Sequence, residues 1–326
     1  MLIYHASQHI ACYEDARRTL GQIGHTVAGP CQSGHSWVMG LEQVPQWSEL
    51  NWSDMKGSTG RFYKAHKDEY AKYGAFLCTY PPAYAMLYAL WQKPIIIHAP
   101  IRFDYPWSDS KEHLSIWIEW IRYWSKKGLL ILTANNRYDS WWITKNTGCQ
   151  CETISCICEY PGIRYDGSTP KEYFLAYKKN AQIKLPDNCV DRAGMGKHQY
   201  SDLLRFAGIV HIPYQVSTMS IFEQYFAGIP MFVPSIGYLR ELYKQGQAMS
   251  EAHWSRRQMI DWQQVAKCAD YYTELAHVQR FDNISHLNRL LKTVDLRKIN
   301  HDQNNNNAVR KERILTQWDS LLKKPS

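Results

Sequence analysis

The fold is decided by the stretch IVHIPYQVSTMSIFEQYFAGIPMFVPS, which occupies residues 209–235. Residues 209–212 form a short apolar run, which predicts a buried strand. Ser220 is followed three residues later by Glu223, a spacing typical of a capping box at the start of a helix. A glycine ends that helix, and residues 231–233 form the next apolar run. The stretch therefore predicts a strand, a helix and a second strand in direct succession.

The rest of the chain repeats this alternation of short apolar runs and longer helical segments. Such alternation predicts parallel βαβ units, and hence an α/β fold. Residues 149–170 contain several turn signals from residue 161 onward, and we interpret this stretch as the last strand of the first domain followed by the linker between two domains. The expected strands are 2–4, 76–79, 95–98, 129–133, 174–177, 209–212 and 231–233. The expected helices are 14–23, 83–91, 111–127, 200–206, 221–226, one or two within 254–275, and 310–322, with the polar tract 304–307 as a loop.

The loop between the strand and the helix has the composition of an anion site. Residues 214–219 contain small hydroxyl side chains, and the helix that follows offers free backbone N–H groups and the positive end of its dipole. Ser217, Thr218 and Ser220 can add hydroxyl donors, and Glu223 can accept from ribose hydroxyls. The alternative is an ordinary capped helix in which Glu223 only completes the capping box.

Residues 211–235 resemble the donor-binding motif of GT-B glycosyltransferases, which has a small-residue loop, a helix with a glutamate, Gly-x-Pro and an apolar strand. The resemblance implies two Rossmann-like domains that face each other across a cleft. It implies an acceptor domain at 1–165, a nucleotide-sugar domain at 166–308, and a final helix at 309–326 that packs back on the first domain.

The resemblance also assigns roles to residues of the motif. It places Glu223 on the nucleotide ribose and the residues Ser217, Thr218, Met219 and Ser220 on the diphosphate. Tyr214 is a further donor-binding candidate. The motif departs from its retaining, two-glutamate version, because Gln215 stands eight residues before Glu223. In this fold the first strand of the second domain commonly supplies a cation, which gives Lys178 or Lys179 that role. The alternative is a pair of solvated lysines.

Polar and aromatic residues follow four expected strands of the first domain, where ligands bind in open α/β sheets. Sugars are recognised by hydrogen bonds and aromatic faces, so this edge is the expected acceptor site. For each aromatic side chain, core packing is the alternative. The acceptor-binding candidates are His5, Tyr80, Arg102, Asn136 and Tyr138, and Tyr105 and Trp107 are further stacking candidates.

Inverting transfer needs a general base that removes the proton of the acceptor hydroxyl. Asp104 ranks first because it lies on the longest of these loops, and His9 and Asp139 follow. His98 is a fourth candidate, with a buried core histidine as its alternative, while Asp139 has helix capping as its alternative. We find no suitable Asp-x-Asp motif, so we expect neither a metal nor another cofactor.

The composition bounds the function classes. The chain has 326 residues with 38 Lys and Arg against 30 Asp and Glu, a net charge of +8 that suits an anionic ligand or a mildly basic protein without one. We expect no nucleic-acid partner, membrane span or signal peptide, and hence a cytoplasmic protein. The cysteines near 149–158 are spaced too closely for a usual zinc site, so we expect reduced core thiols.

The resemblance to GT-B enzymes implies a metal-independent glycosyltransferase that moves a hexosyl or pentosyl group from a nucleotide-sugar donor to a glycan or other hydroxyl acceptor. Fold alone does not fix function. Two alternatives stay open: a nucleotide-sugar epimerase-like enzyme of the same architecture, and a sugar- or nucleotide-binding protein without activity.

Overall fold

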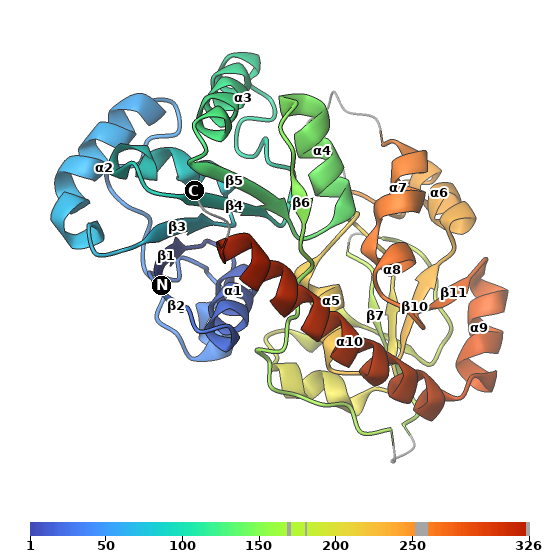
Figure 1. Cartoon of the computed structure of the whole chain (residues 1–326). Coiled ribbons are helices and arrows are strands. Elements are labelled where there is room, and N and C mark those ends of the chain that lie inside the picture. The colour runs from blue at the N-terminus through green and yellow to red at the C-terminus, as the bar shows by residue number, and fades with distance from the viewer. Residues whose placement is uncertain (168–170, 180, 252–259, 324–326) are drawn as a thin grey trace. The chain divides into compact units, whose positions relative to one another are not determined.

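The computed structural model describes residues 1–167, 171–179, 181–251 and 260–323 (Figure 1). Packing divides them into two compact units. Unit 1 comprises residues 1–156 and 312–323, and unit 2 comprises residues 157–251 and 260–311, within the described ranges. Each unit contains one parallel β-sheet with helices around it.

The sheet of unit 1 has six parallel strands in the order β2-β1-β3-β4-β5-β6. Its central strands are apolar and buried on both faces, as expected for a parallel sheet covered by helices. The strands are β1 Leu2–Ala6, β2 Thr26–Ala28, β3 Ala75–Cys78, β4 Ile95–Ala99, β5 Leu130–Ala134 and β6 Glu152–Thr153. The helices are α1 Ile10–Gln22, η1 Ser36–Met39, α2 Met55–Tyr70, η2 Pro82–Trp91, α3 Lys111–Lys126 and α4 Arg137–Thr147.

The sheet of unit 2 has five parallel strands in the order β11-β10-β9-β7-β8. Because β7 lies between β8 and β9, the ends of these three strands meet at one edge. The strands are β7 Phe174–Tyr177, β8 Cys189–Asp191, β9 Ile209–His211, β10 Met231–Pro234 and β11 Gln279–Phe281. The helices are η3 Arg192–Met195, η4 Tyr200–Arg205, α5 Met219–Phe226, α6 Ile236–Lys244, α7 Trp262–Cys268, α8 Asp270–Thr273, α9 Ile284–Thr293 and α10 Leu296–Lys323.

The expected strands are found within one or two residues of their predicted ends, and the α/β fold is confirmed. Two of the expected helices, η2 and η4, are 3-10 helices. The segment expected to hold one or two helices contains α7 and α8, and its first residues lie outside the described ranges.

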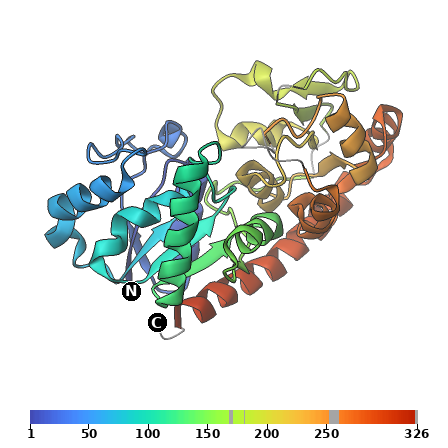
Figure 2. The same cartoon turned by 90° about the horizontal axis from the view of Figure 1, so that it is seen from above.

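The prediction of a loop at 304–307 is wrong, because these residues lie inside α10, one unbroken helix of 28 residues (Figure 1, Figure 2). Three asparagines of α10, namely Asn300, Asn306 and Asn307, pair with α5 and its C-terminal turn. Asn300 donates to the carbonyl of Gly228 at 2.7 Å, and Asn307 donates to that of Tyr225 at 2.8 Å. From residue 312 onward α10 belongs to unit 1, where the Trp318 ring contacts His98. None of the described helices is long and apolar enough to cross a membrane.

Candidate functional site: an anion pocket in unit 2

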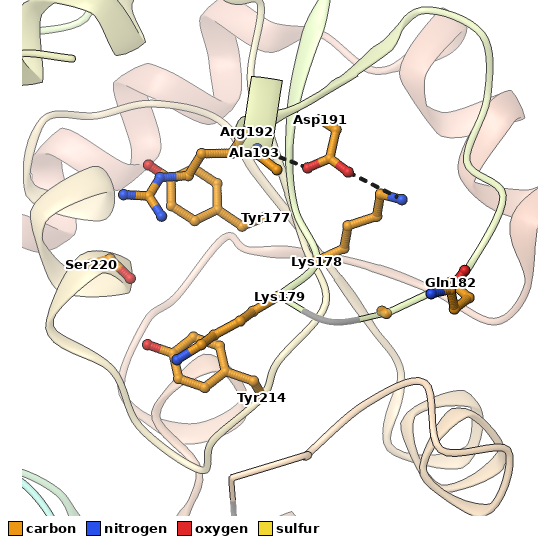
Figure 3. A pocket seen from close by; sticks show the side chains of 10 residues that line it. Tyr177, Lys178, Lys179, Gln182, Asp191, Arg192, Ala193, Tyr214 and Ser220 are labelled. Carbon is orange, nitrogen blue, oxygen red and sulfur yellow. Dashed lines mark hydrogen bonds and ion pairs between the residues drawn. The ribbon is translucent and has the colours of Figure 1, made fainter. Parts of the chain in front are cut away.

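The pocket of unit 2 lies where β7, β8 and β9 end and α5 begins (Figure 3). Strand register places Tyr177, the last residue of β7, directly beside His211, the last residue of β9. The pocket measures about 580 Å³, which is within the usual range for small-molecule sites. Its lining consists of Tyr177, Lys178, Lys179, Ala181, Gln182, Asp191, Arg192, Ala193, Tyr214 and Ser220.

Two of the three cations in the pocket are paired with carboxylates. Lys178 Nζ lies 3.2 Å from an Asp191 carboxylate oxygen, and Lys179 Nζ lies 2.5 Å from one of Glu251. The Lys179 ammonium also lies 4.7 Å from the centre of the Tyr214 ring. The structure thus brings together both lysines and Tyr214, which the sequence predicted for donor binding.

Arg192 is the third cation, and the sequence interpretation missed it. Its guanidinium lies over the Tyr177 ring, 4.7 Å from the ring centre, and points into the pocket (Figure 3). It makes no ion pair with any residue that the structure describes. Arg192 directly follows β8, a strand of three residues, which is too short for periodicity to reveal. In the sequence, only the adjacent charges of Asp191 and Arg192 could have pointed to Arg192 as a residue of the anion pocket.

The start of α5 differs from the predicted capping box. The N-cap is Thr218, no side chain caps the helix, and the Ser220 hydroxyl lies 3.3 Å from that of Thr218. The capping-box prediction is wrong because the helix begins at Met219, which places Ser220 in its first turn. Of the four loop residues predicted for the diphosphate, only Ser220 lines the pocket, whereas Ser217, Thr218 and Met219 are buried.

Glu223 is held by two tyrosines of unit 2. The hydroxyls of Tyr160 and Tyr200 both donate to Glu223 Oε1, the latter at 3.1 Å. Burial and the Glu223 charge raise the pKa of both phenols well above the ordinary value. Burial raises the pKa of both Tyr177 and Tyr214 to about 12, and the Glu223 charge raises the two values by less than the Arg192 charge lowers them.

Two polar side chains are buried next to the pocket. His211 is fully buried, and burial followed by the Arg192 charge lowers its pKa to about 3. Neither ring nitrogen of His211 and neither side-chain polar atom of Gln224 has a hydrogen-bond partner among the described residues. Groups of this kind are uncommon in protein interiors, and they frequently accompany a bound water or ligand.

In unit 1 the acceptor candidates fall into two groups, the first at the ends of β1 and β3. His5 Nε2 lies 2.9 Å from Thr79 Oγ1, and burial lowers its pKa to about 3. His9 is half-buried and lies edge-on to the Tyr80 ring at 5.9 Å, and burial lowers its pKa to about 4. Tyr80 in turn stacks on Tyr105 at 5.4 Å.

The second group surrounds the start of α4. Arg102 and Asp139 are buried and form an ion pair of 3.3 Å. Asn136 donates to the Asp139 carboxylate at 2.7 Å and is itself the N-cap of α4, so the expectation that Asp139 caps this helix is wrong. The Arg102 guanidinium also lies over the buried Tyr138 ring. Burial raises the Asp139 pKa, while Arg102 lowers it.

The remaining candidates of unit 1 are Asp104, Trp107 and His98, and all three are buried. Trp142 Nε1 lies 3.4 Å from Asp104 Oδ1, and Asp104 is buried. Trp107 is buried as well and donates to the carbonyl of Trp52. His98 is a buried core histidine that lies 3.0 Å from Thr133 Oγ1, with its pKa lowered to about 3.

All nine cysteines are free thiols. Cys156 and Cys158 are buried, whereas Cys149 and Cys151 are half-buried. Burial raises the pKa of Cys151 to about 12, which makes its thiolate, the form that binds metals, scarce at neutral pH.

Comparison with known proteins gives likeness of structure only, since no family model and no curated protein matches the sequence. HepE of Anabaena, solved in complex with UDP and glucose, matches with a TM-score of 0.52 and 10% identity over 99% of each chain. MnaA of S. aureus, solved with UDP, matches with a TM-score of 0.50 and 10% identity over 100% of this chain and 99% of MnaA. The chain therefore has an α/β fold of two Rossmann-like units, the fold of GT-B glycosyltransferases.

Proposed function

We propose that this protein is a glycosyltransferase that binds a nucleoside-diphosphate sugar in the pocket of unit 2. One observation carries the proposal: three cationic side chains and the first turn of α5 meet in one pocket beside an aromatic ring. A diphosphate is the ligand that this chemistry fits best. The UDP in the HepE and MnaA structures, which share the fold, supports the same class of ligand.

The pocket suits the chemistry of sugar transfer because charge develops on the diphosphate as the bond to the sugar breaks. Lys178, Lys179 and Arg192 line the pocket in which that charge would appear, and positive groups placed there stabilise a leaving group. We propose that these cations and the α5 dipole perform this role without a divalent metal. Nucleotide affinity is then unchanged by EDTA.

We assign Glu223 to the nucleotide ribose. It lies one turn after Ser220, which lines the pocket, and its charge acts on the lining rings of Tyr177 and Tyr214. Glu223 accepts from Tyr160 and Tyr200 and does not form a capping box at the α5 N-terminus.

The acceptor is proposed to be a glycan or other hydroxyl compound bound by unit 1. His9 is now the preferred base among Asp104, His9 and Asp139. It is half-buried, whereas both aspartates are buried, and burial lowers its pKa to about 4, which keeps it neutral at pH 7 but makes it a weak base. We keep acceptor binding as the proposed role of the five candidates of unit 1, which are His5, Tyr80, Arg102, Asn136 and Tyr138.

Turnover separates the proposed function from its alternatives. UDP-, GDP- and dTDP-sugars are incubated with the protein, with and without EDTA, and free nucleoside diphosphate is measured. We expect slow release of the diphosphate from one donor class, because water can replace the acceptor. Epimerisation of the donor sugar, seen by NMR without release, would indicate the epimerase-like enzyme. Binding with neither reaction would indicate a nucleotide-binding protein.

A further inference from the structure

We propose that Tyr160 and Tyr200 are positioning residues that fix the Glu223 carboxylate for the two ribose hydroxyls of the bound nucleotide. The proposal rests on the proposed function and adds a substrate class to it, because a site of this kind selects a ribonucleotide donor over one whose sugar lacks hydroxyls.

Both tyrosines act on one oxygen of the carboxylate. Tyr160 comes from the segment that follows residue 156, Tyr200 opens η4, and both hydroxyls donate to Glu223 Oε1. Their own hydroxyl oxygens lie 3.4 Å apart, and the rings meet edge-on at an interplanar angle of 80°. A carboxylate oxygen offers about two lone pairs, so two donors at Oε1 match its capacity and fix the orientation of the group.

The tyrosines stay donors over the whole physiological pH range. Tyr160 is fully buried, and burial together with the Glu223 charge keeps the pKa of both phenols far above neutrality. Neither phenol can therefore ionise and repel the carboxylate. Hydrogen bonds to a charged acceptor are also stronger than those between neutral groups.

Glu223 is not itself among the lining residues of the pocket, but it lies on the same helix, α5, as the lining residue Ser220. Glu223 follows Ser220 by three residues on α5, which places both side chains on the same face of the helix. Ser220 lines the pocket, and the Glu223 charge adds to the effect of burial in raising the pKa of the lining residues Tyr177 and Tyr214. A ribose next to a diphosphate on the α5 N-terminus is thus within reach of Glu223.

A free glutamate side chain loses rotamer freedom when it binds a ligand. The two phenols remove this freedom in the unliganded protein, so less is lost on binding. A purely structural role of the tyrosines, in which they only satisfy a partly buried carboxylate, predicts altered stability and no change in the preference for ribose.

The test compares the affinity for UDP with that for 2′,3′-dideoxy-UDP by calorimetry, in wild type, Tyr160→Phe and Tyr200→Phe. A matched control is Tyr165→Phe, since Tyr165 is a buried phenol of unit 2 that donates to the carbonyl of Ala207 at 2.8 Å. Glu223→Gln serves as the reference for loss of the charged acceptor. Thermal unfolding of each variant reports on the fold.

We expect wild type to bind UDP about tenfold or more tighter than the dideoxy compound, as for a lost hydrogen bond to a charged group. Each Tyr→Phe change at Glu223 should reduce that ratio by about three- to tenfold, by weakening UDP alone, and Tyr165→Phe should leave it unchanged. Because Tyr200 is only half-buried, its variant keeps the test valid if Tyr160→Phe fails to fold.

Equal loss for both ligands, or no loss for either, would overturn the positioning role while leaving nucleotide binding intact. Equal wild-type affinity for the two ligands would remove Glu223 and its tyrosines from the ribose site. Wild type that binds none of UDP, GDP, ADP and dTDP would overturn the proposed function itself, and the positioning role with it.

Discussion

Replacement of Arg192 by Gln is the sharpest single test of the pocket. Arg192 is exposed and has no ion pair among the described residues, so its charge is available to a ligand. Among the residues that the structure describes, removal of this charge breaks no ion pair and leaves no carboxylate unpaired. The change therefore acts on the ligand with little effect on the fold.

The magnitude follows from the surroundings of each cation. A hydrogen bond to a charged group contributes about 1.5–3 kcal/mol, and solvent screening of the exposed Arg192 favours the lower end, about tenfold in affinity. Lys178→Met should cost more than this, because it also leaves Asp191, 3.2 Å away, as an unpaired negative charge in the pocket. The double variant Lys178→Met/Asp191→Asn should recover part of that extra loss.

Calorimetric titration with UDP at two salt concentrations measures these effects. We expect a weaker salt dependence in Arg192→Gln, since one charge fewer is screened. The control is Arg205→Gln, because Arg205 is an exposed arginine of unit 2 that does not line the pocket. Equal affinities in wild type and Arg192→Gln, or an equal loss in Arg205→Gln, would refute the assignment of the diphosphate to this pocket.

Three further predictions concern the fold. Gly228→Ala should lower the free energy of unfolding by about 1–3 kcal/mol in urea titrations, because Gly228 has a φ of 76° and a Cβ there would lie 2.6 Å from a side-chain amide of α10; an unchanged midpoint would contradict this. Arg102→Met leaves Asp139 buried and unpaired, so it should destabilise unit 1 by about 3–5 kcal/mol. The same change at the exposed Arg122 should cost less than about 1 kcal/mol, and equal losses would count against the buried pair. Buried histidines with a pKa near 3 stay neutral in the folded state, whereas the unfolded chain takes up protons below about pH 6.5, so stability should fall as the pH drops from 6.5 towards 3. The slope of the free energy of unfolding against pH, followed by thermal unfolding, should correspond to about one proton fewer in His98→Asn than in wild type. An unfolding midpoint that does not change with pH would contradict the assignment. The histidines concerned are His5, His98 and His211.

Sequence pattern was sufficient for the central strands of the two sheets, but not for the short edge strands β2, β8 and β11 or for the helix ends. Buried parallel strands are continuous apolar runs, so residues 95–99 and 231–234 could be recognised without knowledge of their neighbours. The helix at the asparagines 304–307 could not be recognised in this way. A polar tract of this kind is helical here because distant groups at the end of α5 accept hydrogen bonds from its side-chain amides. The capping box at Ser220 failed for a related reason: tyrosines remote in sequence hold the Glu223 carboxylate.

The candidate site was predicted in part. Lys178, Lys179 and Ser220 could be identified because they directly follow strands or begin a helix. Arg192 follows a strand too short to detect, and Tyr160 reaches Glu223 across 63 residues of sequence. Contacts of this kind depend on the packing of unit 2, and no local periodicity encodes them.

Calorimetry of diphosphate binding tests the central claim most directly. UDP, GDP and dTDP are titrated into the full chain next to the matching nucleosides, and the titrations are repeated with Lys179→Ala/Arg192→Ala. The account predicts that at least one nucleoside diphosphate binds with a stoichiometry of about one, that its nucleoside binds at least about tenfold more weakly, and that the double variant abolishes the difference. Nucleosides that bind as tightly as their diphosphates, or a double variant with wild-type affinity, would contradict it.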